Sequence, residues 1–477
     1  MEDSYKYRLF YFISIAFIVL NSVAITQDIL WLGILPVVFL FALLVLFKLD
    51  AVLLMLSFII PLSVNIDNIG FGLGISLPSE PLLMLIMVLA LFKFLIDAQY
   101  DFKVFKHPIS IVIVLNIIWT IITTFSSELP ITSAKFLLSK LWFVVVFYFL
   151  GVPLFKKQQN IHRYIWFYGI ALLFVIFYTL KVHSEYGLSQ KFSYTVGMPF
   201  FVSHGVYASA LCYILPLLVC YLVFPKVFKL NLFSYSAIAF VAIMFFVGLF
   251  FSFTRASWLS VAVAMVILIP ISLRISFNTI LLLLFSTIAL VFVFQNQLMY
   301  LLSKNNQESS KNYFEHIRSA SNIKTDASNT ERLNRWSCAI DMFMDRPIVG
   351  FGPGTYSFVY GPYQLSRNRT IISTDYGDGG NAHSEYLQPL SETGLIGMLL
   401  VLALVYTTLS TGFRIFYTAS QKHVKYQALG ILLGMLTYYV HGLLNNYSET
   451  DKIACLFWSF MAMLTAIDLY HNKKQIN

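Results

Sequence analysis

Long apolar runs recur along most of this chain, and they constrain its fold more than any other feature. Runs of roughly 17 residues or more follow one another over most of the sequence, and each is long enough to span a hydrocarbon layer about 30 Å thick. Hydrophobic residues make up 58% of the 477 positions and charged residues 12%, whereas a soluble domain carries about 25% charged residues. The sequence therefore predicts an all-α polytopic integral membrane protein.

The apolar runs predict about fourteen membrane spans. Their ranges are roughly 9–25, 29–47, 51–65, 81–97, 108–125, 136–153, 163–181, 200–224, 233–253, 256–272, 275–294, 394–411, 427–444 and 453–470. The segment 51–65 is short and neighbouring pairs can merge or lie re-entrant, so we expect about 12 to 14 helices. The first run follows two basic residues, as a secretory signal does. It is long, lacks a small-x-small cleavage site and precedes another span, so we expect it to be retained.

The positions of lysine and arginine predict the orientation of these helices, because cytoplasmic loops carry an excess of both residues. With the N-terminus inside, the basic residues beside the spans fall mostly on the cytoplasmic side. The exceptions, which lie in or beside short outer loops, are Lys135, Lys140, Lys181, Lys191, Arg255 and Lys452. Both termini are then cytoplasmic and the one long polar stretch faces out. The predicted parts are an N-terminal bundle (1–294), a large periplasmic catalytic loop (295–390) and C-terminal helices (391–477).

The same distribution explains the net charge of +9, so we expect membrane lipids and no nucleic acid as partners. Of the four cysteines only Cys338 lies in the large loop, which leaves no disulfide framework and no metal-ligand spacing. Asp375 and Asp378 also lack the ligand number and spacing of a calcium loop. We therefore expect no metal and no cofactor.

Within the large loop, residues 331–346 are predicted to form a helix. Ser328 and Glu331 fit a capping box, and a proline at position 347 marks the far end. Arg332 and Arg335 fall in the first turn, where the helix dipole is already positive. Two cations there become favourable if an anion binds. The alternative is a solvated face on which the two arginines pair with neighbouring carboxylates.

Two further motifs follow in the loop. The segment G-F-G-P-G (350–354) predicts a tight turn that lets the backbone approach other groups closely, but it lacks the context of a dinucleotide site or a P-loop. His383 follows Asn381 and precedes a predicted helix over 384–390. A histidine there is suited to accept a proton near neutral pH. The alternative is a helix-capping or interface histidine.

Outside the loop, Arg255 lies between two apolar stretches that together run from about 233 to 272. A charge near a membrane core costs about 3 kcal/mol, so it usually faces a cavity or a partner. We expect an anion ligand at the outer face, with a snorkelling helix-end arginine as the alternative. His204 begins another span on the same side and is a secondary polar contact. In the last outer loop Glu449 and Asp451 are candidates for hydrogen bonding to sugar.

In this order the motifs resemble the O-antigen ligase and polymerase superfamily of bacterial envelope glycosyltransferases. The matching positions are Arg332 with Trp336; Pro347, Gly350, Gly352 and Gly354; His383 with Leu387; and Glu392, Gly394 and Gly397. The segment 254–258 looks like the family's Ser-Arg-Gly segment, with Thr254 and Ala256 in place of serine and glycine. These motifs cover roughly 250–400, and the rest agrees only in having many membrane helices.

The resemblance implies transfer of a glycan from undecaprenyl diphosphate to a sugar hydroxyl at the periplasmic face of the inner membrane. The acceptor is lipid A–core in ligases and the growing glycan in polymerases, and some relatives transfer to protein. It implies Arg255 and Arg332 as diphosphate ligands, Arg335 as a supporting anion contact and His383 as general base. The predicted supporting residues are Trp336, Gly352, Gly354, Asn381, Tyr386, Glu392 and His204. We expect a ligase-like, inverting and metal-independent transfer.

Three alternatives remain at this point. A polymerase shares the motifs and differs in its acceptor. A transporter or flippase for lipid-linked sugars predicts repeated halves and charges along a pathway through the membrane, but no repeat is visible and charges within spans, such as Lys140, are few. The third alternative is a sensor whose loop binds a sugar. Substitution of Arg332 and His383 would distinguish this sensor from an enzyme.

Overall fold

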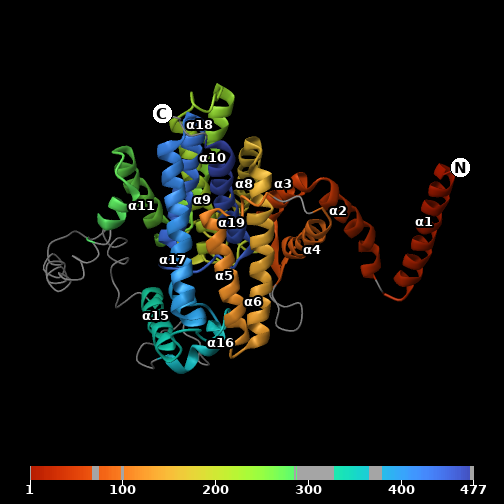
Figure 1. Cartoon of the computed structure of the whole chain (residues 1–477), viewed down its shortest axis with the longest axis horizontal. Coiled ribbons are helices and arrows are strands. Elements are labelled where there is room, and N and C mark those ends of the chain that lie inside the picture. The colour runs from red at the N-terminus through yellow and green to blue at the C-terminus, as the bar shows by residue number, and fades with distance from the viewer. Residues whose placement is uncertain are drawn as a thin grey trace. The chain divides into compact units, whose positions relative to one another are not determined.

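The computed structural model describes residues 2–28, 30–66, 75–97, 101–283, 286, 327–364 and 379–472, and these are mostly helical (Figure 1). Two short strands, β1 (Val64–Ile66) and β2 (Ile75–Leu77), pair antiparallel with Val64 opposite Leu77. The prediction of an all-α polytopic membrane protein is confirmed. Asp375, Asp378 and most of the predicted span 275–294 lie outside the described residues.

The chain divides into two compact units. The first comprises Met1–Leu53 and Met84–Tyr100. Its elements are α1 (Glu2–Thr26), the 3-10 helix η1 (Leu30–Ile34), α2 (Leu35–Phe47) and most of α4 (Ser79–Asp97). Within this unit the ammonium of Lys93 donates a hydrogen bond to the carbonyl of Leu46 (3.2 Å), which ties α4 to the end of α2.

The second unit comprises Leu54–Leu83 and Asp101–Asn477 and contains every predicted site residue. Its elements, beginning with α3, which starts in the first unit, are α3 (Leu49–Ile59), η2 (Ile60–Leu62), α5 (Pro108–Phe125), α6 (Pro130–Phe143), η3 (Val144–Phe149), α7 (Gly151–Phe155), α8 (Gln158–Glu185), η4 (Gln190–Phe192), α9 (His204–Val223), α10 (Leu232–Phe251), α11 (Arg255–Ser272), α15 (Ala327–Asp345), α16 (Tyr356–Val359), η6 (Gly361–Tyr363), α17 (Leu387–Thr418), α18 (Lys422–His441), α19 (Asp451–Ala466) and η8 (Ile467–His471).

Eight of the described helices are long and apolar enough to cross a membrane. They are Pro108–Phe125, Pro130–Phe155, Gln158–Glu185, His204–Val223, Leu232–Phe251, Arg255–Ser272, Leu387–Thr418 and Asp451–His471, and each coincides with a predicted span. Shorter apolar helices cover Ser14–Thr26, Leu32–Phe47 and Leu49–Leu62. α4 and α18 form at the predicted spans 81–97 and 427–444.

The centre of the second unit is built from α9, α18 and α19, which lie side by side in Figure 1. Of the most apolar 18 residues in each span, 83% are buried within the protein in the spans that begin with α9 and α19, against 28% in α11. Gly434 lets α18 approach α9 closely, because a Cβ there would meet the carbonyl oxygen of Tyr213 at 2.3 Å. The rings of Tyr213 and Phe460 then pack edge to face at 5.4 Å. The outer helices leave their remaining apolar faces for lipid.

Two predicted boundaries are wrong. α15 begins at Ala327, so Ser328 lies inside the helix and is not its N-cap. The helix predicted at 384–390 begins at Leu387 and continues into the next span as α17. Gly394 interrupts that long helix with φ 70° and ψ −170°, a conformation that glycine adopts without steric cost. The helix therefore changes direction at Gly394, beside the glycine-rich turn.

Candidate active site

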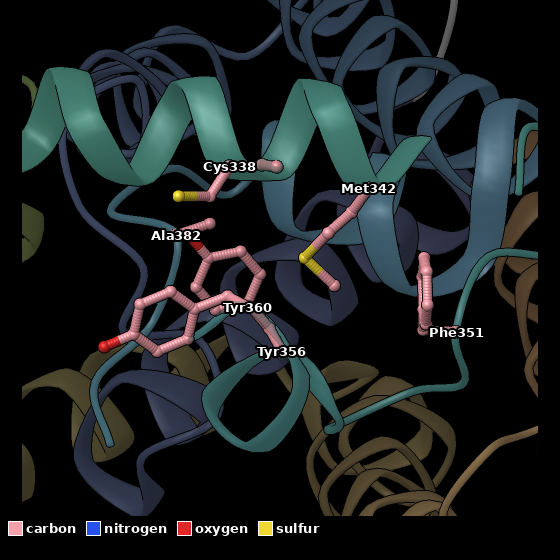
Figure 2. Close-up of a cluster of buried hydrophobic side chains, with 7 residues drawn as sticks. Cys338, Met342, Phe351, Tyr356, Tyr360 and Ala382 are labelled. Carbon is pink, nitrogen blue, oxygen red and sulfur yellow. The ribbon is translucent and has the colours of Figure 1, made fainter. Parts of the chain in front are cut away.

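The large loop has a small hydrophobic core that holds α15 in place. Cys338, Ala339 and Met342 of α15 are buried with Tyr356 and with the other residues of the cluster: Phe351, Tyr360 and Ala382. Figure 2 shows Cys338 and Met342 pointing from α15 toward the tyrosine rings, and the Tyr356 hydroxyl donates to the carbonyl of Arg335 (2.8 Å). Because Ala382 belongs to this core, α15 is fixed against the residue that precedes His383.

Arg335 is buried, with a side chain 5% exposed. Its Nε donates to Glu331 (2.8 Å) and its Nη1 to the carbonyl of Gly379 (3.0 Å). The guanidinium also lies 3.9 Å from the centre of the Tyr360 ring. The predicted alternative of a pair with Glu331 is thus present, but it is buried and not solvated. Arg335 ties α15 to the segment that leads into His383.

Arg332 points to a different part of the molecule. It is half-buried, and its Nε donates to the carbonyl of Leu444 (3.2 Å), in the loop between α18 and α19. Its guanidinium is close enough for its charge to act on the rings of His204, His383 and His441. A guanidinium whose charge acts on three histidine rings attracts an anion to this region.

His383 is held by its backbone, which leaves the ring available. Its N–H donates to Asn381 Oδ1 (3.0 Å) and its carbonyl accepts from the Trp336 indole (3.3 Å). Its φ of 50° lies in the left-handed region, which is uncommon for a residue other than glycine. Among the described residues the imidazole has no hydrogen-bond partner. Burial, followed by the charges of Arg332 and Arg335, lowers its pKa to about 4, so the ring is neutral near pH 7.

The beginnings of α9 and α11 lie next to Arg332. His204 opens α9, and its carbonyl accepts from the Thr254 hydroxyl (3.4 Å). Arg255 follows as the first residue of α11, which has no side-chain cap. Because both helices begin in this region, their positive ends add to the attraction for an anion. His204 Nδ1 is buried without a partner among the described residues.

His441, at the end of α18, is a further histidine of this region. It is 1% exposed, its Nδ1 lies 3.4 Å from Ser257 Oγ on α11, and its Nε2 has no partner among the described residues. An unpaired buried nitrogen is costly unless something bonds to it. We refer to Arg255, Arg332, His383, His204 and His441 together as the arginine–histidine site.

The glycine-rich turn forms a second polar region, which we call the glycine clamp: Gly350, Gly352, Gly354, Glu392 and Gly394. The Glu392 carboxylate accepts from the N–H groups of Gly354 (2.9 Å) and Tyr356 (3.0 Å), and its carbonyl accepts from Gly352 (2.8 Å). At Gly352, with φ 111°, a Cβ would meet Ser127 Oγ at 2.0 Å. The turn's N–H groups are therefore engaged by the protein itself.

Glu392 of the clamp also belongs to a buried pair of carboxylates with Glu449. The Gln388 amide donates to both Glu392 (3.3 Å) and Glu449 (3.4 Å). Lys140, whose ammonium donates to Thr120 (3.0 Å), lies close enough to act on both carboxylates. Burial and then the charges of Glu392 and Glu385 raise the pKa of Glu449. Glu449 is thus part of a buried network and is not an exposed sugar ligand.

Residues 239–402 match the family model described as O-antigen ligase. The chain carries an O-antigen ligase domain. This confirms the resemblance to the O-antigen ligase and polymerase superfamily. The apolar helices are those of a multi-pass membrane protein. The domain extends from α10 into α17 and includes Arg255, Arg332, His383 and Glu392. No curated protein matches the chain.

The O-antigen ligase domain brings some of the predicted residues together and separates others. Trp336, Asn381 and His383 are joined by hydrogen bonds, and Asn381 Nδ2 also donates to the carbonyl of Asn446 (3.0 Å). Arg332 donates to Leu444 in the same loop as Asn446. The Tyr386 hydroxyl donates to the carbonyl of Tyr439 (2.9 Å) and so attaches the start of α17 to α18. The predicted supporting residues Gly352, Gly354 and Glu392 belong to the separate glycine clamp.

Two other carboxylates, Glu385 inside the domain and Asp451 beyond it, are structural anchors. The Glu385 carboxylate accepts from the N–H groups of Tyr447 (2.8 Å) and Ser448 (2.9 Å) and from the Tyr438 hydroxyl. It holds the loop that receives Arg332. Asp451, predicted as a sugar contact, is 2% exposed and pairs with Lys452 (2.9 Å). That prediction is wrong, because the Asp451 carboxylate is engaged inside the bundle.

Sequence reasoning missed His441 because its partner Ser257 is 184 positions away. The available signal was a histidine at the end of an otherwise apolar run, since an ionisable residue in a span is by default a functional candidate. In the described part of the chain, no three histidine, cysteine, aspartate or glutamate residues gather to hold a metal ion.

Proposed function

We propose that this protein transfers a glycan from undecaprenyl diphosphate to an acceptor sugar hydroxyl at the periplasmic membrane face, as an O-antigen ligase with lipid A–core as acceptor. The observation that carries the proposal is the neutral ring of His383, free of hydrogen bonds to the described residues, within reach of the Arg332 charge. His383 can then accept a proton and Arg332 can bind an anion at the same end of the helix bundle.

His383 takes the role of general base. As the acceptor hydroxyl attacks the anomeric carbon, its proton moves to an imidazole nitrogen of His383. The pKa of about 4 in the empty site makes the ring a weak base. A bound diphosphate opposes the charges of Arg332 and Arg335, and the pKa of His383 then rises toward its ordinary value. Donor binding therefore prepares the base for the reaction.

Arg332 and Arg255 take the role of diphosphate ligands. A carbon–oxygen bond forms between the acceptor and the anomeric carbon, and the bond to the diphosphate oxygen breaks. The leaving diphosphate is stabilised by charge-assisted hydrogen bonds from guanidinium groups and by the positive ends of α9 and α11. Arg335, engaged by Glu331, supports this site mainly through its charge. A single direct displacement inverts the anomeric configuration.

The predicted topology supports the periplasmic location, because it places the starts of α9 and α11 and the large loop on the outer side. A lipid-linked donor approaches such a site from the bilayer between helices. A polymerase would use the same site and differ only in taking the growing glycan as its acceptor. The product in the host separates the two.

The test is deletion of the gene in its host and electrophoresis of the surface polysaccharide. Complementation uses the wild type, His383→Ala and, as a matched control, His423→Ala at the other end of the bundle. We expect core lipid without chains in the deletion strain, and rescue by the wild type and the control but not by His383→Ala. Core with a single repeat would identify a polymerase. Rescue by His383→Ala would overturn the catalytic assignment.

A further inference from the structure

A second region of interest lies at the end of the bundle away from the arginine–histidine site. A cavity of about 430 Å³ lies between the later halves of α9 and α11 and the first half of α18. α9 begins at His204 and α11 at Arg255, whereas the cavity reaches Val223 and Ile271 near the other ends of these helices. It is therefore separate from the proposed site of transfer.

The lining of this cavity is largely aliphatic. Contributing side chains include Leu215, Val219, Val261, Met265, Leu268 and Leu433. Its volume falls within the roughly 300–1,000 Å³ of ordinary ligand pockets. A lining of this kind suits a hydrocarbon chain, because apolar surface gains free energy when another apolar group covers it.

Two cations, Arg274 and Lys425, lie at the end of the cavity where α11 ends and α18 begins. Neither pairs with a carboxylate in the part of the chain that the structure describes. The ammonium of Lys425 lies 4.4 Å from the centre of the Phe416 ring. Two neighbouring positive groups without a carboxylate repel each other, and an anion between them removes that repulsion.

The backbone places Arg274 in an unusual conformation. Its φ is 57°, and its N–H donates to the carbonyl of Ile271 (3.1 Å) while that of Ile275 donates to Pro270 (3.0 Å). This is the Schellman pattern that ends a helix, and its left-handed position favours glycine. This position holds an arginine in place of the favoured glycine. We therefore look for the role of this residue in its side chain.

The start of α18 carries its own positive charge. Lys422 and Lys425 lie in its first turn, and Gln421 provides no side-chain cap. Cations at a helix N-terminus are unfavourable unless an anion binds there. The end of α11 attracts a cation and would account for Arg274 alone, but it does not account for Lys425.

We propose that this cavity binds an anionic phospholipid, with an acyl chain between α9, α11 and α18 and the phosphate between Arg274 and Lys425. The predicted topology places this end on the cytoplasmic side, where the membrane surface is negative. Charge complementarity selects the headgroup, and the aliphatic lining selects a ligand with a hydrocarbon chain.

The test is native mass spectrometry of the full chain, purified and stripped of lipid in detergent. The probes are phosphatidylglycerol and phosphatidylcholine. We expect tighter binding of phosphatidylglycerol, weakened about 25-fold in Arg274→Gln/Lys425→Gln. We take about 1 kcal/mol for each basic residue next to the bound headgroup, and 1.4 kcal/mol is a factor of ten. The control Lys106→Gln/Lys226→Gln removes the same charge from exposed positions outside the cavity and leaves the affinity unchanged.

Val261→Trp tests the cavity itself, because it fills the space and keeps both cations. We expect it to weaken binding of both phospholipids, and we expect inorganic phosphate alone not to displace phosphatidylglycerol. Unchanged phosphatidylglycerol binding in either the double variant or Val261→Trp would overturn the proposal, and so would displacement by phosphate. If the double variant does not fold, Lys425→Gln alone gives the same comparison at about fivefold.

Discussion

The O-antigen ligase domain contains the glycine clamp and, with Arg255, Arg332 and His383, most of the arginine–histidine site, but the polar groups of the two regions are used differently. In the glycine clamp, Glu392 accepts two backbone N–H groups with its carboxylate and a third with its carbonyl. In the arginine–histidine site, the His383 ring has no hydrogen-bond partner among the described residues. His204 and His441 each have a buried nitrogen without one.

Whether a polar group already has a hydrogen-bond partner indicates which residues of these motifs stabilise the fold and which take part in the reaction. Buried polar groups with partners hold a structure together. Unpaired groups beside a cation cost stability, and such groups cluster where a ligand completes them. Substitutions in the glycine clamp should therefore lower stability first, whereas substitutions in the arginine–histidine site should lower transfer while the fold remains.

After His383→Ala, we expect Arg332→Ala to cause the largest loss of transfer activity without unfolding the protein. Removing one donor to a developing oxyanion typically lowers the rate about 10²–10³-fold. The substitution also removes the hydrogen bond to the Leu444 carbonyl. Transfer by the purified protein and its thermal unfolding are measured together. Arg332→Lys should recover part of the rate, since it keeps the charge without the planar fork. Full activity of Arg332→Ala would remove the distinction between the two regions.

Glu392→Ala should have the opposite effect. It leaves the N–H groups of Gly354 and Tyr356 buried without partners, at about 1–3 kcal/mol each. We expect the free energy of unfolding to fall by about 3 kcal/mol. Transfer should fall only with the folded fraction, measured by chemical unfolding of the detergent-solubilised protein. A stable but inactive Glu392→Ala would place Glu392 in the reaction instead.

The pH dependence of stability tests the neutral state of His383. Its pKa is about 4 in the folded protein and 6.5 in the unfolded chain, so the unfolded chain binds more protons between these values. Stability should therefore decrease as pH falls from about 6.5 to about 4, by on the order of 2 kcal/mol at pH 5. His383→Gln should lack this part of the decrease. Identical pH profiles for the two proteins would show that the ring is not held neutral.

The smallest effect is expected for Trp336→Phe. The substitution removes one hydrogen bond to the His383 carbonyl (3.3 Å) and keeps most of the ring. Such a bond contributes about 1 kcal/mol to stability, so the free energy of unfolding should fall by no more than about 1 kcal/mol. The transfer rate should fall severalfold, because the bond positions His383. A loss as large as that of Arg332→Ala would mean that Trp336 contacts the substrate.

The helices could be predicted from sequence because the length of each apolar run is visible in the sequence itself, as in α5 and α10. The turn at Gly352 could be predicted for the same reason, because its glycines are close together in the sequence. The partners were not: Glu392 meets Gly354 across 38 positions and Ser257 meets His441 across 184. Periodicity contains no information about such pairs. For the same reason the sequence placed Arg335 beside Arg332 as a second anion contact, whereas the folded chain buries Arg335 against Tyr360.

The most direct test of the central claim is the single-turnover rate of glycan transfer by purified His383→Ala, measured beside its thermal unfolding curve. The wild type and Glu392→Ala serve as references for activity and for stability. We predict a protein that unfolds like the wild type and transfers about 10²–10⁴-fold more slowly, because a general base contributes that much. A folded His383→Ala that transfers at the wild-type rate would contradict the account.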